Sequence, residues 1–216
     1  MTDPARKAIA TAILDEYGTT FCEELKIHIE HNTPSPLFQL FAFSLLAGTT
    51  VCCGPALAAS RLLFDNGWTT VKKTAGADRA AIAALLERAE FQGASGAAAE
   101  SLVRSAGTIW ELYGGDMRTL REAGEHDPDR VRRLLLELSG MTDEAVEMFF
   151  REVQPVWGEL YPYAGSAALE AAARLELGGS AEELAALVEY DEFTRFVCGL
   201  VRVKLRDQFE SVLARL

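Results

Sequence analysis

Residues 138–145 read LSGMTDEA, and residues 162–170 read PYAGSAALE. The first segment is typical of a tight turn between two helices, and the second of a proline-containing loop that opens a third helix. The order predicted for residues 134–177 is therefore helix, turn, helix, loop and helix.

The rest of the chain continues this helical pattern. In residues 5–16, apolar side chains recur at Ala8, Ile9, Ala12 and Ile13, which is the spacing of one helix face. Residues 37–47 are almost wholly apolar, so we expect them to form a central buried helix. Further helices are predicted at residues 20–31, 55–64, 68–74, 78–89, 97–113, 116–122, 129–138, 180–188 and 191–213. The Ala-, Leu- and Glu-rich composition agrees with this pattern and predicts an all-α fold.

The charge balance limits the partners that the protein can bind. The 216 residues include 32 acidic and 21 basic side chains, which gives a formal net charge of −11. Non-specific affinity for DNA comes mostly from Lys and Arg side chains that neutralise phosphates, so this balance argues against a typical duplex-binding protein. No apolar run approaches the ~18 residues of a membrane-spanning helix. Residues 1–6 also lead into an amphipathic pattern rather than a secretory signal. We therefore expect a cytoplasmic protein without a membrane partner.

Cysteine and histidine are few and poorly placed for a metal site. The four cysteines are Cys22, Cys52, Cys53 and Cys198. Adjacent cysteines in an apolar region are poor disulfide partners and poor metal ligands, and the three histidines lack metal-ligand spacing. We expect reduced, mostly buried thiols and neither a metal nor another cofactor.

The segment at residues 138–145 resembles the hairpin of the helix-hairpin-helix DNA glycosylases, the endonuclease III-like superfamily. The hairpin of that family usually reads Leu-Pro-Gly, an apolar residue and Gly, followed by a helix. The second segment resembles the next signature of the family, which opens a helix ending in Arg-Leu, here Arg174 and Leu175. The resemblance implies a six-helix barrel lobe at residues 34–156, with the hairpin at 134–151. It implies a second helical lobe from residues 1–33 and 157–216, with a DNA-facing cleft between the lobes.

Enzymes of this family extrude a nucleotide and cleave its glycosidic bond. The resemblance implies a carboxylate at the start of the helix after the hairpin and, in bifunctional members, a lysine that forms a Schiff base. In this chain the carboxylate position falls on Gly165 and the lysine position on Glu144, and neither residue can perform that chemistry. The other interpretation is local structure, in which Gly165 or Ser166 caps a helix and Glu144 is a first-turn acid.

Other features of the family are also altered. A relocated carboxylate is the remaining route to catalysis, and its candidates are Asp143, Glu144 and Glu159. Such an acid in a desolvated cleft could have a raised pKa and act as a general base. Residues 46–51 read LAGTTV and lack the Gln with which relatives fill the gap left by an extruded base. Only Cys198 lies in the C-terminal region where many relatives bind an iron–sulfur cluster, so no such cluster is expected.

The hairpin is expected to be a poor DNA contact. The residues in the DNA-binding hairpin position are Ser139, Gly140, Met141 and Thr142. The resemblance implies that such a turn and the helix N-terminus after it hold a DNA phosphate. Thr142 replaces a glycine that often has a left-handed conformation, which predicts a steric penalty. Asp143 and Glu144 follow at once and would repel a phosphate. Leu138 and Met141 are predicted to face the core.

Two functional hypotheses follow. The favoured one is a diverged, glycosylase-like pseudoenzyme of this DNA repair superfamily, without base-excision or lyase activity, that acts as a binding or repurposed scaffold. The alternative is an active DNA repair glycosylase that uses a relocated carboxylate on an unusual lesion. The partners considered are damaged DNA, bound weakly, and another protein, and the oligomeric state is left open. Gly165→Asp is expected to be accepted by the fold, with a change in stability of about a few tenths of a kcal/mol.

Overall fold

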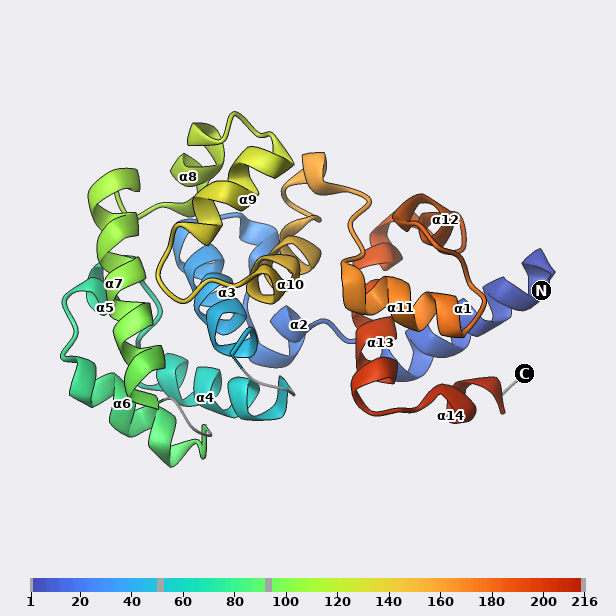
Figure 1. The fold of residues 1–216 in the computed structure, drawn as a ribbon, viewed down its shortest axis with the longest axis horizontal. Helices are drawn as coiled ribbons and strands as arrows, with labels where there is room; N and C mark the ends of the chain where they lie inside the picture. Colours follow the sequence, from blue (N-terminus) through green and yellow to red (C-terminus); the bar gives the residue numbers. More distant parts are fainter. Residues whose placement is uncertain (1, 50–52, 92–94, 215–216) are drawn as a thin grey trace. The chain divides into compact units, whose positions relative to one another are not determined.

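The computed structural model describes residues 2–49, 53–91 and 95–214. Every regular element in these ranges is a helix, which confirms the predicted all-α class (Figure 1). The chain divides into two compact units, here called the central unit (Leu25–Phe149) and the terminal unit (Met1–Glu24 with Phe150–Leu216).

The central unit is built around α3. Its elements are η1 (Ile29–His31), α3 (Pro34–Ala47), α4 (Cys53–Asp65), α5 (Val71–Ala75), α6 (Arg79–Arg88), α7 (Ser95–Tyr113), α8 (Met117–Ala123), α9 (Pro128–Leu136) and α10 (Asp143–Val153) as far as Phe149. Almost every residue of α3 from Leu37 onward is buried, including Phe38, Phe41 and Phe43. Helices α4, α7 and α8 contact α3. The apolar run thus forms the predicted central buried helix.

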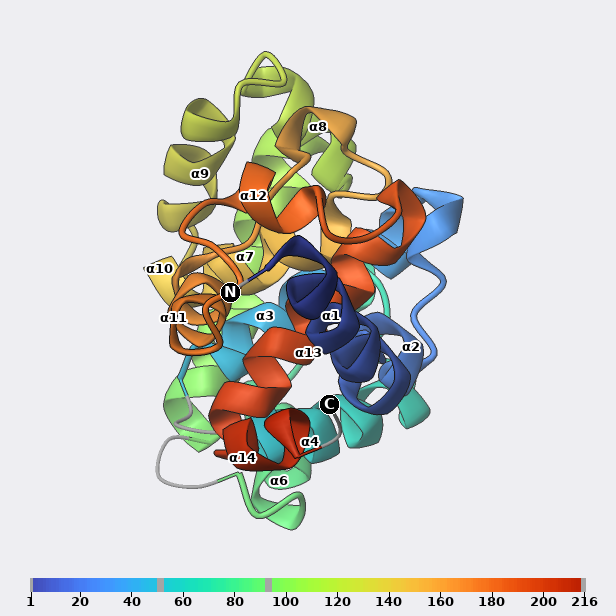
Figure 2. The ribbon, with the colours of Figure 1, turned by 90° about the vertical axis from the view of Figure 1, so that its right-hand side faces the viewer.

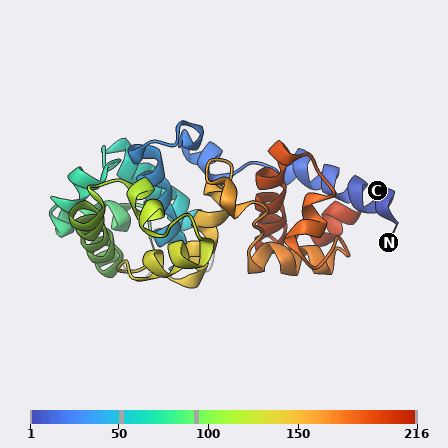
Figure 3. The same cartoon turned by 90° about the horizontal axis from the view of Figure 1, so that it is seen from above.

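The terminal unit is built around α13. It contains α1 (Asp3–Tyr17), α2 (Phe21–Leu25) as far as Glu24, the last turn of α10, η2 (Gly158–Leu160), α11 (Ser166–Arg174), α12 (Ala181–Ala185), η3 (Tyr190–Glu192), α13 (Phe193–Leu205) and α14 (Phe209–Leu213). Helices α1 and α11 pack against α13 (Figure 2). A Cβ atom at Gly199 would lie 2.6 Å from Cγ2 of Ile13, so glycine permits the close approach of α1. The first and last helices, α1 and α14, both lie in this unit (Figure 3).

Two predicted helices are interrupted, and left-handed residues mark both breaks. Residues 20–31 form α2 and then η1, because Lys26 has φ 57° directly after α2. Residues 191–213 were expected to be one helix, but α13 ends at Leu205 and α14 starts at Phe209. Asp207 has φ 48° between them. Such a residue ends the run of helical hydrogen bonds.

Some sequence predictions concern residues outside the described ranges. Cys52 and the end of the segment at residues 46–51 belong to this group. Among the helices that the structure describes, none combines the length and apolar character needed to cross a membrane.

Candidate functional site

The turn between α9 and α10 packs closely on α7. Gly140 has φ 81°, a left-handed conformation that favours glycine. A Cβ atom at Gly140 would lie 2.6 Å from the Cβ atom of Ser101. The Ser105 hydroxyl donates a 2.8 Å hydrogen bond to the Ser139 carbonyl. Glycine therefore permits both the shape of the turn and its contact with α7.

The residues beside Gly140 test two predictions that the sequence makes for this turn. Leu138 and Met141 are 3% and 7% exposed, so both face the core as predicted. The expected steric penalty at Thr142 does not arise, because the left-handed residue of the turn is Gly140. Instead, Oγ1 of Thr142 accepts a 3.2 Å hydrogen bond from the Ala145 N–H and caps α10.

The first turn of α10 is crowded by the protein's own groups. A Cβ atom at Gly48, which follows α3, would lie 2.7 Å from the Cβ atom of Ala145 and 2.9 Å from Oγ1 of Thr142. Asp143 and Glu144 are the acids of this first turn, and both are exposed. Negative charge at a helix N-terminus is stabilised by the helix dipole, so these acids favour the helix while occupying its anion-attracting end.

Two of the three arginines before the turn, Arg130 and Arg132, are paired with acids, whereas Arg133 is exposed. Nη2 of Arg132 lies 2.6 Å from Oδ1 of Asp143. Nη1 of Arg130 lies 2.5 Å from Oε2 of Glu125. Exposed ion pairs of this kind contribute only about 0–1 kcal/mol to stability. Their consequence here is electrostatic, since they leave less positive charge for a phosphate near the turn.

Gly165 is the residue before α11 and has φ 78° and ψ 162°. This region of backbone space is essentially restricted to glycine. The expectation that Gly165→Asp is readily accepted is therefore wrong, because aspartate would be strained in this conformation. The Gln154 side chain holds the preceding loop: its Oε1 accepts from the Tyr163 N–H and its Nε2 donates to the Tyr163 carbonyl, both at 3.0 Å. Glu159 lies in η2 and is half-buried.

The candidate residues divide between the two units. Asp143, Glu144 and the turn at residues 139–142 belong to the central unit, whereas Glu159 and Gly165 belong to the terminal unit. Within each unit, the local geometry around these residues is that of helix starts and turns.

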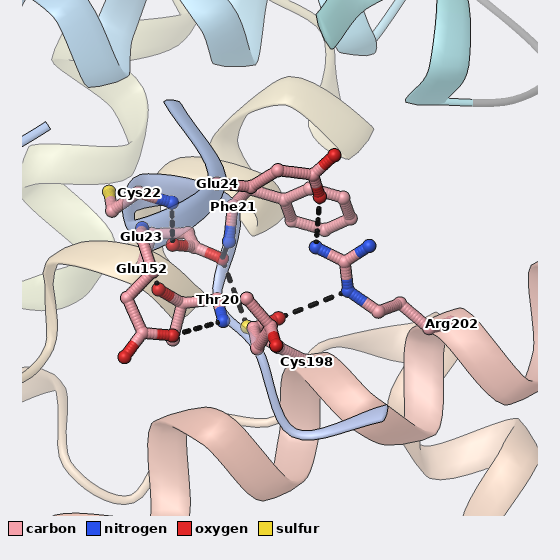
Figure 4. Close-up of polar contacts among 9 residues, drawn as sticks. Thr20, Phe21, Cys22, Glu23, Glu24, Glu152, Cys198 and Arg202 are labelled. Atoms are coloured by element: carbon pink, nitrogen blue, oxygen red, sulfur yellow. Dashed lines mark hydrogen bonds and ion pairs between the residues drawn. The ribbon is translucent and has the colours of Figure 1, made fainter. Parts of the chain in front are cut away.

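The sequence interpretation missed a buried carboxylate at Glu152, in the last turn of α10. Glu152 is 1% exposed and accepts from three donors in the terminal unit (Figure 4). The N–H groups of Phe21 and Cys22 donate to Oε1 and Oε2 at 3.1 and 3.0 Å. The Cys198 thiol donates to Oε1, with Sγ 2.9 Å away. Glu152 therefore ties the start of α2 to α10 and α13.

Two further contacts hold the same segment. Thr20 and Glu23 form a reciprocal cap at the start of α2, with N–H to side-chain oxygen distances of 2.7 and 3.0 Å. Arg202 is buried, donates to the Thr19 carbonyl at 3.0 Å and to Oε2 of Glu24 at 2.8 Å, and lies over the Phe21 ring. Figure 4 shows these residues converging on the start of α2. The arrangement is that of a structural anchor.

The thiols next to Glu152 are protonated. Burial, and then the neighbouring Glu152 carboxylate, raise the pKa of Cys22 and Cys198 well above the ordinary thiol value. Because the thiolate is the reactive form, both thiols are poor nucleophiles. Both are free and buried, as predicted, while Cys53 is half-buried. In the described ranges, no group of three or more His, Cys, Asp or Glu side chains could hold a metal ion.

Comparisons with known proteins found no matching family model, no matching curated protein and no matching solved structure.

Proposed function

We propose that the chain is a diverged helix-hairpin-helix, DNA glycosylase-like scaffold that lacks the base-excision and lyase chemistry of that family and binds DNA weakly. The main support is the first turn of α10, where Asp143 and Glu144 stand at the end of the helix that would attract a phosphate. The Arg132–Asp143 pair, at 2.6 Å, adds to this support.

A DNA phosphate at this turn would meet the N-terminus of α10 and the acids of its first turn. Backbone N–H groups and the helix dipole make a helix N-terminus attractive to anions. In α10, the Ala145 N–H already donates to Thr142, and two carboxylates supply the negative charge. A phosphate would have to approach both carboxylates and displace Asp143 from Arg132. Binding of the family type is therefore disfavoured.

The acids near the turn are also poorly suited to catalysis. Gly165 has no side chain, its backbone conformation disfavours any other residue, and Glu144 cannot form an imine. A relocated catalytic acid would need to be both desolvated and available. Asp143 is exposed and paired with Arg132, and Glu152 is buried but engaged by three donors. These observations favour the scaffold over the alternative of an active DNA repair glycosylase.

Binding to a duplex with an abasic-site analogue tests the electrostatic part of the proposal. Fluorescence anisotropy at several salt concentrations should give a dissociation constant weaker than ~10⁻⁴–10⁻⁶ M at physiological salt, with a shallow salt dependence. The double variant Asp143→Asn, Glu144→Gln should bind about two- to tenfold more tightly, because two repulsive charges leave the turn and Arg132 loses its partner.

The matched control is Glu87→Gln with Glu111→Gln, which makes the same change in net charge at two exposed acids of α6 and α7. This control should leave the affinity nearly unchanged. An equal gain in both double variants would mean that only net charge matters and that the turn is not the contact. Tight binding by the wild type with a steep salt dependence would contradict the proposal.

A further inference from the structure

A cavity of about 370 Å³ lies in the central unit, lined by the starts of α3 and α5 and by residues at the end of α7 and just after it. Small-molecule sites in proteins typically measure about 300–1,000 Å³, so this cavity suits a compact ligand. Its walls include the aliphatic side chains of Pro34 and Val71, the indole of Trp110, and Thr33 and Lys72.

Trp110 supplies a flat apolar wall. Its side chain is 45% exposed, which is high for so large an aromatic residue. Gly115 lies against the indole: a Cβ atom there would be 2.8 Å from Cε3 of Trp110. The absence of a side chain at Gly115 therefore allows the indole to lie close to the backbone of this turn. A planar ring is the ligand shape that stacks best on such a surface.

Lys72 supplies an uncompensated positive charge at the same cavity. Its Nζ lies 5.9 Å from the centre of the Trp110 ring, near the outer limit of a cation–π contact. No carboxylate partner of Lys72 is found within the described ranges. Among the described residues that line the cavity none is acidic, although the chain carries 32 acidic side chains. The Thr33 side chain makes no capping hydrogen bond, so its hydroxyl can also donate to a ligand.

We propose that this cavity binds a small aromatic carboxylate, with the ring on Trp110 and the carboxylate on the Lys72 ammonium. The ring would bury the exposed apolar surface of Trp110 and Pro34. The Lys72 ammonium would meet the negative charge of the ligand. This inference is independent of the proposed DNA-related function, because none of the residues that it uses belongs to the turn at residues 139–142.

The experiment is an NMR titration of the full chain with benzoate, followed through the three tryptophan indole N–H signals. The Trp110 signal, assigned by its loss in Trp110→Leu, should shift in a saturable way with a dissociation constant of roughly millimolar, as expected for so few ligand atoms. The Trp157 signal should stay in place because Trp157 is fully buried. Trp68 does not line the cavity, so its signal is a second internal control.

Lys72→Gln tests the ion pair and should weaken benzoate binding roughly tenfold. Lys73→Gln is the matched control, because it removes the same charge from the next residue, whose ammonium lies 5.1 Å from the centre of the Trp68 ring instead. It should change the dissociation constant by less than about twofold. Trp110→Leu, followed through the Lys72 backbone amide, should weaken binding about two- to tenfold.

Benzamide, the neutral counterpart, should bind much more weakly than benzoate. Equal binding of benzamide, or equal effects of Lys72→Gln and Lys73→Gln, would overturn the assignment of an anion site. No saturable shift of the Trp110 signal in the folded wild type would overturn the site itself. Lys72 is exposed, so its variant tests the proposal even if Trp110→Leu does not fold.

Discussion

Gly165 shows how a single backbone position can exclude a catalytic side chain. Its φ of 78° with ψ of 162° lies in a region that residues with a Cβ atom rarely adopt. The resemblance places a carboxylate at this position, but glycine has no side chain to supply one. The backbone conformation also disfavours any residue with a Cβ atom. An acid at this position would require the loop between residues 161 and 166 to change its path.

Gly165→Asp should lower the free energy of unfolding by about 1–3 kcal/mol, because aspartate would be strained in this conformation. Ser166→Asp is the control, since it adds the same carboxylate one residue later in the first turn of α11. There it should change stability by no more than about 0.5 kcal/mol. Chemical denaturation of both variants measures the difference. Equal stability of Gly165→Asp and the wild type would mean that the loop relaxes freely.

Glu152→Gln should lower the free energy of unfolding by about 1–3 kcal/mol. The amide keeps one acceptor oxygen, but its NH₂ group must face a buried donor, either an N–H of α2 or the Cys198 thiol. Glu144→Gln is the isosteric control on the exposed side of the same helix and should have an effect within about 0.5 kcal/mol. If denaturant titrations gave equal midpoints for the two variants, the anchoring role of Glu152 would be wrong.

At the scale of elements, the sequence predicts which segments are helical, but it does not predict where two of the helices are interrupted. The apolar run of α3 and the periodic pattern of α1 identified both helices from sequence, because their buried faces are continuous. The breaks at Lys26 and Asp207 were missed because no glycine or proline stands at or beside either position, although aspartate adopts left-handed conformations more often than most residues. Both take left-handed conformations that apolar spacing does not reveal.

The sequence predicts only those features of the candidate site that depend on which residue stands at a given position. The residue types at positions 144 and 165 and the acids at the start of α10 can be read directly from residues 138–165. Glu152 could not be identified in this way, because its burial depends on α2 and α13, which are distant in sequence. The sequence contains one weak indication of this burial, because Arg151 and Glu152 lie between the apolar residues Phe150 and Val153. In the structure all four residues are buried.

Asp116, the cap of α8, should make stability depend on pH in the acidic range. Burial alone would raise the pKa of its carboxyl, but hydrogen bonds and the charge of Arg118 outweigh burial and lower it. A lowered folded-state pKa means that the stabilisation is complete above the ordinary carboxyl pKa of about 4 and is lost as pH falls through the folded value.

Asp116→Asn should therefore be less stable than the wild type at pH 7, and this difference should shrink toward pH 3. Asp78→Asn is the control, because Asp78 caps α6 through the Ala80 N–H at 3.0 Å and makes no ion pair within the described ranges. Urea midpoints at several pH values measure both series. A difference for Asp116→Asn that stays constant with pH would show that the Arg118 pair contributes nothing.

At the scale of the whole molecule, composition and local geometry both argue against strong DNA binding. The net charge of −11 opposes general DNA affinity, and the acids at α10 oppose it at the one turn that resembles a DNA-binding hairpin. The all-helical architecture is compatible with the family that the sequence resembles. At the positions where the resemblance would place catalytic residues, the chain has a glycine at a helix start and a helix-stabilising acid.

The claim that the scaffold lacks glycosylase and lyase chemistry is tested most directly by incubating the protein with a panel of damaged duplexes. Base release and borohydride trapping on abasic-site DNA are then measured together. We predict no base release above the background and no covalent adduct, because no lysine stands at position 144 and no carboxylate at position 165. Base release at an enzyme-like rate, or a trapped adduct mapped to a lysine of this chain, would contradict the account.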